Sequence, residues 1–252
     1  MDENKFKGER LDSKSKLSRN NLLEHLARYN LVKGEKDSNI LDIGCGTGYG
    51  SDLLAKSFGG VYGVDISQDA IDYAKKNWQR ENIMFSIGSG TEIPFKQNTF
   101  DITVAFEVFE HIKDWSKFLS ELKRVTKRNG MIYISTPNKN IYSPGTKKPI
   151  NPHHFFEMTE DQFRKALDSY FRIDQFLGQR TPVYNDHWIW KIVDPLLFAF
   201  RQIIPYKINN TIKLKIINWI KPELEYSDIV FSDNAKDIER SRVMVALCIN
   251  KK

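Results

Sequence analysis

Short apolar runs alternate with amphipathic stretches along most of the chain. The apolar runs lie at residues 40–43, 61–64, 83–87, 100–106, 131–135, 171–177 and 242–250. A continuous apolar run indicates a strand buried on both faces of a sheet, and helical segments between such runs favour right-handed crossover connections. The pattern therefore predicts an α/β protein with a doubly wound, mostly parallel sheet of seven strands.

The segments between the runs carry helical spacing and helix-capping residues. We expect helices at residues 18–30, 49–57, 67–78, 115–127 and 159–167. Ser67 and Thr159 can cap two of them, because a side-chain oxygen accepts a hydrogen bond from a free amide of the first turn. Asn129 and Gly130 are expected to end the helix at 115–127 in a left-handed conformation. Residues 136–159 have no period and contain several prolines, which predicts a long functional loop.

Composition and charge narrow the class of protein. The chain has 252 residues, of which 40% are hydrophobic, and this is enough for one sizeable core. Its net charge of +6 is a mild excess of 38 basic over 32 acidic residues, so nucleic acid is not expected as a partner. The two cysteines, Cys45 and Cys248, fit a reducing compartment. Without an apparent signal peptide or membrane span, we expect a cytoplasmic protein, with a peripheral position at the inner face of the membrane as the alternative.

A glycine-rich turn follows the first apolar run. Residues 39–50 read N-I-L-D-I-G-C-G-T-G-Y-G, a strand that leads through a glycine loop into a helix. Asp65 ends the next apolar run about twenty residues after Gly44, where a carboxylate can reach the hydroxyl pair of a ribose. The nicotinamide fingerprint G-x-G-x-x-G is incomplete because Tyr49 occupies its last position. The loop therefore indicates a nucleotide-like ligand and disfavours a nicotinamide oxidoreductase.

Four segments in order resemble class I S-adenosylmethionine-dependent methyltransferases of type 11. They are L-D-I-G-C-G-T-G-Y-G, G-V-D-I-S, F-D-I-T-V-A-F-E-V-F-E-H-I and L-K-R-V-T-K-R-N-G-M-I-Y-I-S-T-P-N. The resemblance covers about residues 20–178 and returns in the last strand. It implies a Rossmann-like fold, an antiparallel last strand and S-adenosyl-L-methionine as cofactor.

The resemblance also assigns cofactor-binding residues. These are Arg28 and Tyr29 in the first helix; Asp42, Gly44, Cys45, Gly46 and Gly48 in the first loop; Asp65 and Ile66; Ser89, Gly90 and Thr91; and Phe106 and Glu107. Ser89 stands where related proteins often carry an acid for the adenine amino group. We therefore expect a backbone group or Glu92 to supply that contact.

Two histidines are the candidates for a catalytic base. Methyl transfer requires alignment of the acceptor and removal of its proton, and imidazole is the natural base near neutral pH. N-P-H-H-F-F-E-M-T resembles a segment N-P-x-H-x-x-E of bacterial methyltransferases in sugar and glycan pathways, which aligns His154 and Glu157. His154 is the preferred base and His111 the alternative, although His111 could also simply cap a helix. No metal is expected at His153, His154 and Glu157, because adjacent histidines in a loop lack the facing geometry of a helical pair.

The chain divides into three parts. We expect a polar arm at 1–17, a methyltransferase domain at 18–180 and 242–252, and an insertion at 181–241 that covers the acceptor side. Residues 188–221 are aromatic and basic, so a peripheral membrane contact is an alternative to burial against the domain or in a homodimer.

The leading hypothesis for the function is methylation of an oxygen atom in a small-molecule or glycan-linked acceptor. One alternative is a quinone or lipid-linked acceptor at the membrane surface. The other is a cofactor-binding subunit without turnover.

Overall fold

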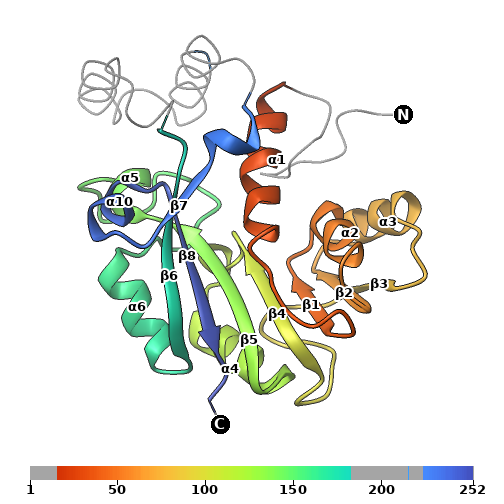
Figure 1. Cartoon of the computed structure of the whole chain (residues 1–252). Helices are drawn as coiled ribbons and strands as arrows, with labels where there is room; N and C mark the ends of the chain where they lie inside the picture. The colour runs from red at the N-terminus through yellow and green to blue at the C-terminus, as the bar shows by residue number, and fades with distance from the viewer. Residues whose placement is uncertain (1–15, 183–214, 216–223, 252) are drawn as a thin grey trace.

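The computed structural model describes residues 16–182, 215 and 224–251. Residues 1–15 of the predicted arm and most of the predicted insertion, including His187 and residues 188–221 apart from 215, lie outside these residues. The described chain forms a central sheet with helices on both faces (Figure 1).

The sheet contains eight strands in the described residues and is mostly parallel. Its strands are β1 (Asn39–Ile43), β2 (Gly60–Asp65), β3 (Ile83–Ile87), β4 (Phe100–Phe106), β5 (Thr126–Pro137), β6 (Arg172–Arg180), β7 (Val230–Ser232) and β8 (Val243–Ile249). The spatial order is β3-β2-β1-β4-β5-β8-β6-β7. β8 runs antiparallel to both β5 and β6, as expected for the last strand. The structure has one strand more than the seven predicted. The additional strand is β7, which lies in the range predicted as an insertion and pairs with β6 at the edge of the sheet.

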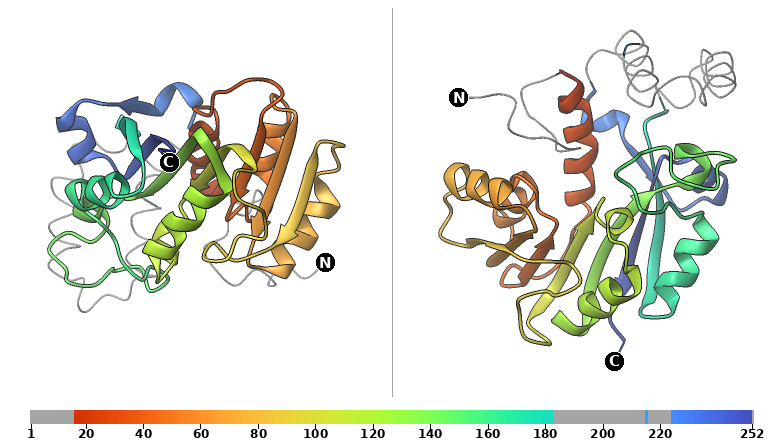
Figure 2. Two further views of the ribbon diagram at one scale, coloured as in Figure 1. Left: turned by 90° about the horizontal axis from the view of Figure 1, so that it is seen from below. Right: turned by 180° about the vertical axis from the view of Figure 1, so that it is seen from behind.

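The helices cover the sheet in two layers (Figure 2). They are α1 (Lys16–Tyr29), α2 (Tyr49–Ala55), α3 (Gln68–Asn77), η1 (Phe109–His111), α4 (Trp115–Val125), α5 (Lys139–Tyr142), α6 (Glu160–Asp168), η2 (Tyr226–Asp228) and α10 (Ala235–Arg240). Tyr29 and Leu54, from α1 and α2, pack in one core with Val104 of β4. Leu119 and Phe163, from α4 and α6, pack in a second core on the other face. Apolar strands are therefore buried from both sides.

Two helix caps form where the sequence predicts them. The Ser67 hydroxyl accepts a hydrogen bond from the Ala70 amide at the start of α3. Thr159 and Gln162 form a reciprocal capping box at the start of α6, which satisfies two amides that the helix itself leaves unpaired.

The predicted end of the helix at 115–127 is wrong. α4 ends at Val125, and Thr126 already begins β5, where a bulge interrupts the pairing with β4. Asn129 does have the predicted positive φ, 62°, but it lies in this bulge. Contacts of Asn250 explain why the helix ends early. The backbone of Asn250 exchanges hydrogen bonds with Asn129 and Gly130. Its side-chain amide donates to the carbonyls of Lys123, Thr126 and Lys127. The end of β8 thus satisfies carbonyls that a left-handed cap would otherwise serve.

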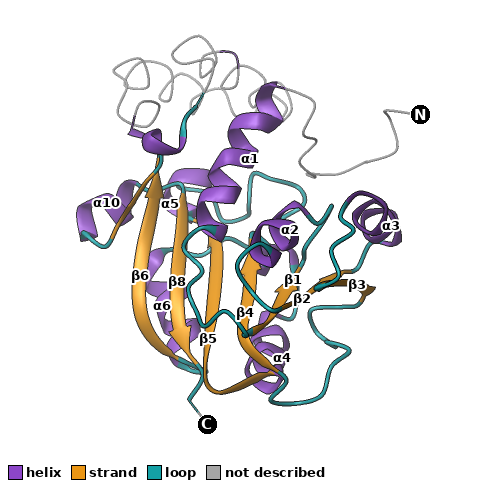
Figure 3. Ribbon diagram, turned by 45° about the vertical axis from the view of Figure 1, so that its right-hand side comes forward, coloured by secondary structure: helices purple, strands orange, loops and turns teal. Residues whose placement is uncertain are grey.

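Two segments enclose the carboxyl end of the sheet. α1 stands above the ends of the central strands (Figure 3). The loop after β5 is tied down by a bridge between Asn138 and Met158, and α5 lies within it. None of the helices in the described residues is long and apolar enough to cross a membrane. Ligand sites of doubly wound sheets lie at this end, so the two segments frame the candidate site.

Candidate functional site

The glycine loop after β1 is bonded to the end of β2. Gly44 and Cys45 both donate their amides to the Val64 carbonyl. The Asp65 carboxylate accepts the amide of Gly46 at 2.9 Å on one oxygen and that of Ser67 at 2.9 Å on the other. A carboxylate has about four acceptor positions, so Asp65 retains capacity for the two hydroxyls of a ribose.

Gly46 is the glycine that faces open space. Its φ is 53°, and a Cβ atom built on it would meet no other atom within 4 Å. At Gly44 the same atom would lie 2.2 Å from Cγ2 of Val108, so that glycine serves close packing. The backbone at Gly46 is therefore open to a ligand, as the resemblance implies.

Asp42 and Tyr29 bond to each other beneath this loop. The Tyr29 hydroxyl donates to one Asp42 oxygen at 3.0 Å, and the Ser51 hydroxyl donates to the other at 2.7 Å. Burial raises the pKa of Asp42 to about 7 against these two hydrogen bonds. Tyr29 also packs edge-on against Phe106, with ring centroids 5.0 Å apart. These three predicted cofactor residues form the buried base of the site.

Arg28 is buried and lacks one partner. Its guanidinium donates to the side chain of Gln179, whose amide in turn donates to the Glu24 carbonyl at 2.8 Å. The Nε atom of Arg28 is buried without a hydrogen-bond partner in the described structure. An unpaired buried donor indicates a missing acceptor, and the carboxylate of a methionine moiety has the required charge. Arg28 therefore fits its predicted role toward the cofactor.

The predicted adenine side combines exposed apolar and hydroxyl groups. Ile66 directly follows Asp65 and is 75% exposed. The Ser89 hydroxyl accepts the Thr91 amide at 3.2 Å and contacts the Thr91 hydroxyl at 3.0 Å, so these groups close the turn around Gly90. An exposed apolar side chain beside a polar turn can accommodate a flat heteroaromatic ring. The partner of the adenine amino group stays a prediction.

Glu107 has a strained backbone at the end of β4. Its φ is 55°, a conformation that costs a non-glycine residue about 1–3 kcal/mol. The Glu107 amide donates to the Ser135 hydroxyl at 3.0 Å, and that hydroxyl donates back to the Glu107 carboxylate at 2.8 Å. The two hydrogen bonds with Ser135 therefore fix this carboxylate at the carboxyl end of the sheet.

The two candidate bases lie side by side. The rings of His111 and His154 are nearly perpendicular, with centroids 4.9 Å apart. Nδ1 of His111 donates to the His153 carbonyl at 2.9 Å, and Nδ1 of His154 donates to the Glu157 carboxylate at 2.7 Å. Glu110 is buried beside them. We call Glu110, His111, Asn151, His154 and Glu157 the histidine cluster; the exposed side chain of His153 is not part of it.

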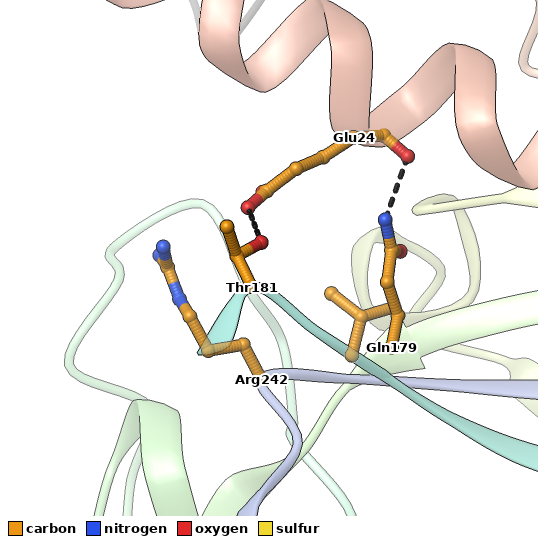
Figure 4. Close-up of a pocket in the computed structure, with 5 residues that line it drawn as sticks. Glu24, Gln179, Thr181 and Arg242 are labelled. Atoms are coloured by element: carbon orange, nitrogen blue, oxygen red, sulfur yellow. Dashed lines mark hydrogen bonds between the residues drawn. The ribbon is translucent and has the colours of Figure 1, made fainter. Parts of the chain in front are cut away.

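A small pocket that the sequence did not reveal lies between α1, β6 and β8 (Figure 4). Its lining residues are Glu24, Gln179, Thr181, Arg242 and Val243. The Thr181 hydroxyl donates to the Glu24 carboxylate at 2.7 Å, and the Arg242 guanidinium lies over the Tyr142 ring at 5.4 Å. Tertiary structure alone brings these side chains together, because they come from three segments that lie far apart in the sequence: α1, the end of β6 and the start of β8.

The fold and the loop define the class of protein. A 3-2-1-4-5 core with a glycine loop after β1 and an acid after β2 is the cofactor half of a Rossmann-like enzyme domain. Residues 41–134 match a family model described as "Methyltransferase domain". Residues 41–134 therefore match a methyltransferase domain, and the fold and loop are those of class I S-adenosylmethionine-dependent methyltransferases, which indicates S-adenosyl-L-methionine as cofactor.

Known proteins support the same assignment. A Mycobacterium tuberculosis protein named "Probable S-adenosylmethionine-dependent methyltransferase" is 35% identical over 129 residues, 51% of this chain and 46% of that protein. A ubiquinone biosynthesis O-methyltransferase of Pelagibacter ubique is 31% identical over 110 residues, 43% of this chain and 45% of that one. The chain thus spans about half the length of these curated relatives.

The fold has solved counterparts. The crystal structure of an S-adenosylmethionine-dependent methyltransferase from Mesorhizobium loti matches with a TM-score of 0.59 and 14% identity, over 90% of this chain and 98% of that one. At this identity the match concerns the fold alone.

Proposed function

We propose that this protein transfers the methyl group of S-adenosyl-L-methionine to an oxygen atom of a small-molecule or glycan-linked acceptor. The observation that carries the proposal is the pair of imidazoles at the carboxyl end of the sheet, with Nδ1 of each ring held by an acceptor. When Nδ1 carries the proton, Nε2 of a neutral imidazole is the nitrogen that can accept one. An alcohol acceptor needs such a group, because its proton has to leave as the methyl group arrives.

His154 and His111 are alternative candidates for the base, and their surroundings differ. His154 donates to the buried carboxylate of Glu157, an arrangement that stabilises an imidazolium after proton transfer. The side chain of His111 is 34% exposed and so is open to an acceptor. We keep His154 as the first candidate and His111 as the second. In S-adenosylmethionine the methyl carbon is already activated, so alignment supplies the rest of the rate.

The acceptor class is open to a direct experiment. The purified protein is incubated with labelled S-adenosyl-L-methionine and, separately, with nucleotide sugars, glycans, quinones and extracted lipids. Label in a glycan or nucleotide sugar supports the proposal. Label in a quinone or lipid supports the second candidate, which the ubiquinone biosynthesis relative favours. Cofactor binding without label in any acceptor class would identify a binding subunit instead.

The base is tested on the acceptor that is found. His154→Gln and His111→Gln are each expected to lower the rate about a hundred- to ten-thousand-fold if that residue is the base, with cofactor affinity nearly kept. His153→Gln is the matched control, because that side chain is exposed and adjacent to His154. Full turnover in both variants would mean that alignment alone drives the reaction. A peripheral membrane contact and a homodimer remain further proposals for residues outside the described structure.

A further inference from the structure

Three possible ligands of a metal ion converge in the histidine cluster. One ligand atom each from Glu110, His111 and His154 lies within 4.8 Å of the other two. Glu110 and His111 belong to η1, directly after β4, and His154 belongs to the loop after β5. The loop is fixed on η1 by a hydrogen bond from the Phe155 amide to the Glu110 carbonyl at 2.9 Å. The convergence therefore comes from two separate chain segments that are bonded together.

The tautomers of both histidines suit metal binding. A carbonyl can only accept, so Nδ1 of His111 donates its proton to the His153 carbonyl. The Glu157 carboxylate likewise accepts the Nδ1 proton of His154. Metal-binding histidines usually donate their second ring nitrogen to a carboxylate or a backbone carbonyl in this way, which fixes the ring and raises its basicity. Nε2 is then the ligating atom of each ring.

Two buried carboxyl groups also belong to the cluster. Glu110 is 1% exposed and accepts the Thr136 hydroxyl at 3.0 Å, and Glu157 is 5% exposed. Oxygen Oε2 of Glu157 is buried without a hydrogen-bond partner in the described structure. A cation among these carboxylates would compensate their charge.

We propose that Glu110, His111 and His154 bind a divalent first-row transition-metal ion. Two of the three donors are imidazole nitrogens, which suit Zn²⁺ better than Mn²⁺ or Mg²⁺. The sequence alone suggested no metal, because the ligands considered there were His153, His154 and Glu157. The structure assembles a different set, in which Glu157 supports a ligand and His153 contributes only a carbonyl.

Small side-chain movements would complete the site. Ligand atoms about 2.1 Å from a tetrahedral ion stand roughly 3.4 Å apart. The three ligand atoms here lie within 4.8 Å of one another, so those farthest apart would have to move closer. The Asn151 amide, 2.9 Å from Nε2 of His154, would have to turn away from that nitrogen. Both changes are rotations of side chains and leave the backbone in place.

Metal binding goes beyond the proposed methyl transfer and does not require it. In the metal-free site, the histidines act as proton acceptors. With an ion bound, Nε2 of each histidine is a ligand, and the ion lowers the pKa of an acceptor hydroxyl that it contacts. The ion can therefore be titrated in the absence of any acceptor.

The experiment titrates tag-free, chelator-treated, full-length protein with Zn²⁺, Mn²⁺ and Mg²⁺ by calorimetry, with electron paramagnetic resonance as a second readout for Mn²⁺. We expect one bound ion with affinities in the order Zn²⁺, Mn²⁺, Mg²⁺. His111→Gln, the half-exposed ligand, should lower Zn²⁺ affinity by more than about 100-fold. Glu157→Gln should lower it about 10- to 100-fold, because it acts through His154. His153→Gln should bind as the wild type does.

The proposal is overturned if the wild type binds none of the three ions at millimolar concentration. It is also overturned if His111→Gln binds Zn²⁺ as tightly as His153→Gln does, since the ion would then lie elsewhere. Binding of S-adenosylhomocysteine to each variant shows that it is folded. If the wild type binds the metal ion but does not bind S-adenosylhomocysteine, the proposed function is contradicted and the metal site is not.

Discussion

Nδ1 of His154 donates a 2.7 Å hydrogen bond to Glu157, and the two side chains are only 3% and 1% exposed. They are three residues apart in a loop that has no helix or strand at this point. The pair therefore fixes the loop after β5 against the end of the sheet, whatever role the imidazole has in chemistry.

Glu157→Gln should lower the free energy of unfolding by about 1.5–3 kcal/mol, the usual contribution of a buried hydrogen bond to a charged group. The measurement is urea unfolding of the wild type and the variant. Glu160→Gln is the control, since its carboxylate pairs with Arg164 near the surface and such pairs contribute about 0–1 kcal/mol. Equal losses in the two variants would contradict a special role for the buried pair.

Asp65→Ala should weaken binding of S-adenosylhomocysteine about ten- to a thousand-fold, because the carboxylate accepts from the glycine loop and is the predicted partner of the ribose hydroxyls. Asp65→Asn keeps one acceptor oxygen and should lie between the wild type and the alanine variant. Calorimetry measures the affinities. The control is Asp72→Ala, an exposed aspartate in α3 that bonds Gln68. Unchanged affinity in a folded Asp65→Ala protein would show that the cofactor lies elsewhere.

Asp42 makes stability depend on pH. Burial raises its pKa from 3.8 to about 7 in the folded protein, whereas the unfolded chain keeps the ordinary value. Between these values the folded state binds more protons, so the free energy of unfolding falls as pH rises from about 4 to about 7. The total contribution is on the order of 4 kcal/mol, present in full at the acid end and lost above pH 7.

Asp42→Asn removes this titration. Urea unfolding at several pH values should show that the decline of wild-type stability across this range is reduced in the variant. The same slope in both proteins would mean that Asp42 is already ionised at low pH, held so by the hydrogen bonds of Tyr29 and Ser51.

Asn250→Ala should lower the free energy of unfolding by about 1–3 kcal/mol, because three carbonyls around the bulge of β5 lose their donor. Lys251→Ala, at the next and exposed position, should change it by less than about 0.5 kcal/mol. Thermal unfolding followed by circular dichroism measures both. A variant as stable as the wild type would show that water replaces the lost donor.

Local patterns predicted the sheet well. Strands β3 and β4 have the predicted limits. β4 is buried along nearly all of its length, as an apolar run predicts, whereas β3 is an edge strand with Met84 and Ile87 exposed. The caps at Ser67 and Thr159 were also predictable, since each depends on atoms within one helical turn.

The rest depends on contacts between distant segments. The end of α4 was wrong because Asn250 supplies the missing donors from another strand. Glu110 and Thr136 share a hydrogen bond across 26 residues, and Gln179 bonds α1 across 155. The sequence named His111 and His154 as alternatives, and the structure shows them in contact. No local spacing contains that information.

The position of β8 between β5 and β6 delays assembly of this half of the sheet until the end of synthesis. β6 has no partner in the sheet until β7 or β8 arrives, and residues 181–242 leave the ribosome before β8 does. At about 5–20 residues per second, this interval lasts roughly 3–12 s. During that time the growing polypeptide exposes the unpaired edge of β5 and, until β7 arrives, both edges of β6 to other chains. Whatever shields those edges in the cell decides how much of the newly made protein reaches the native sheet.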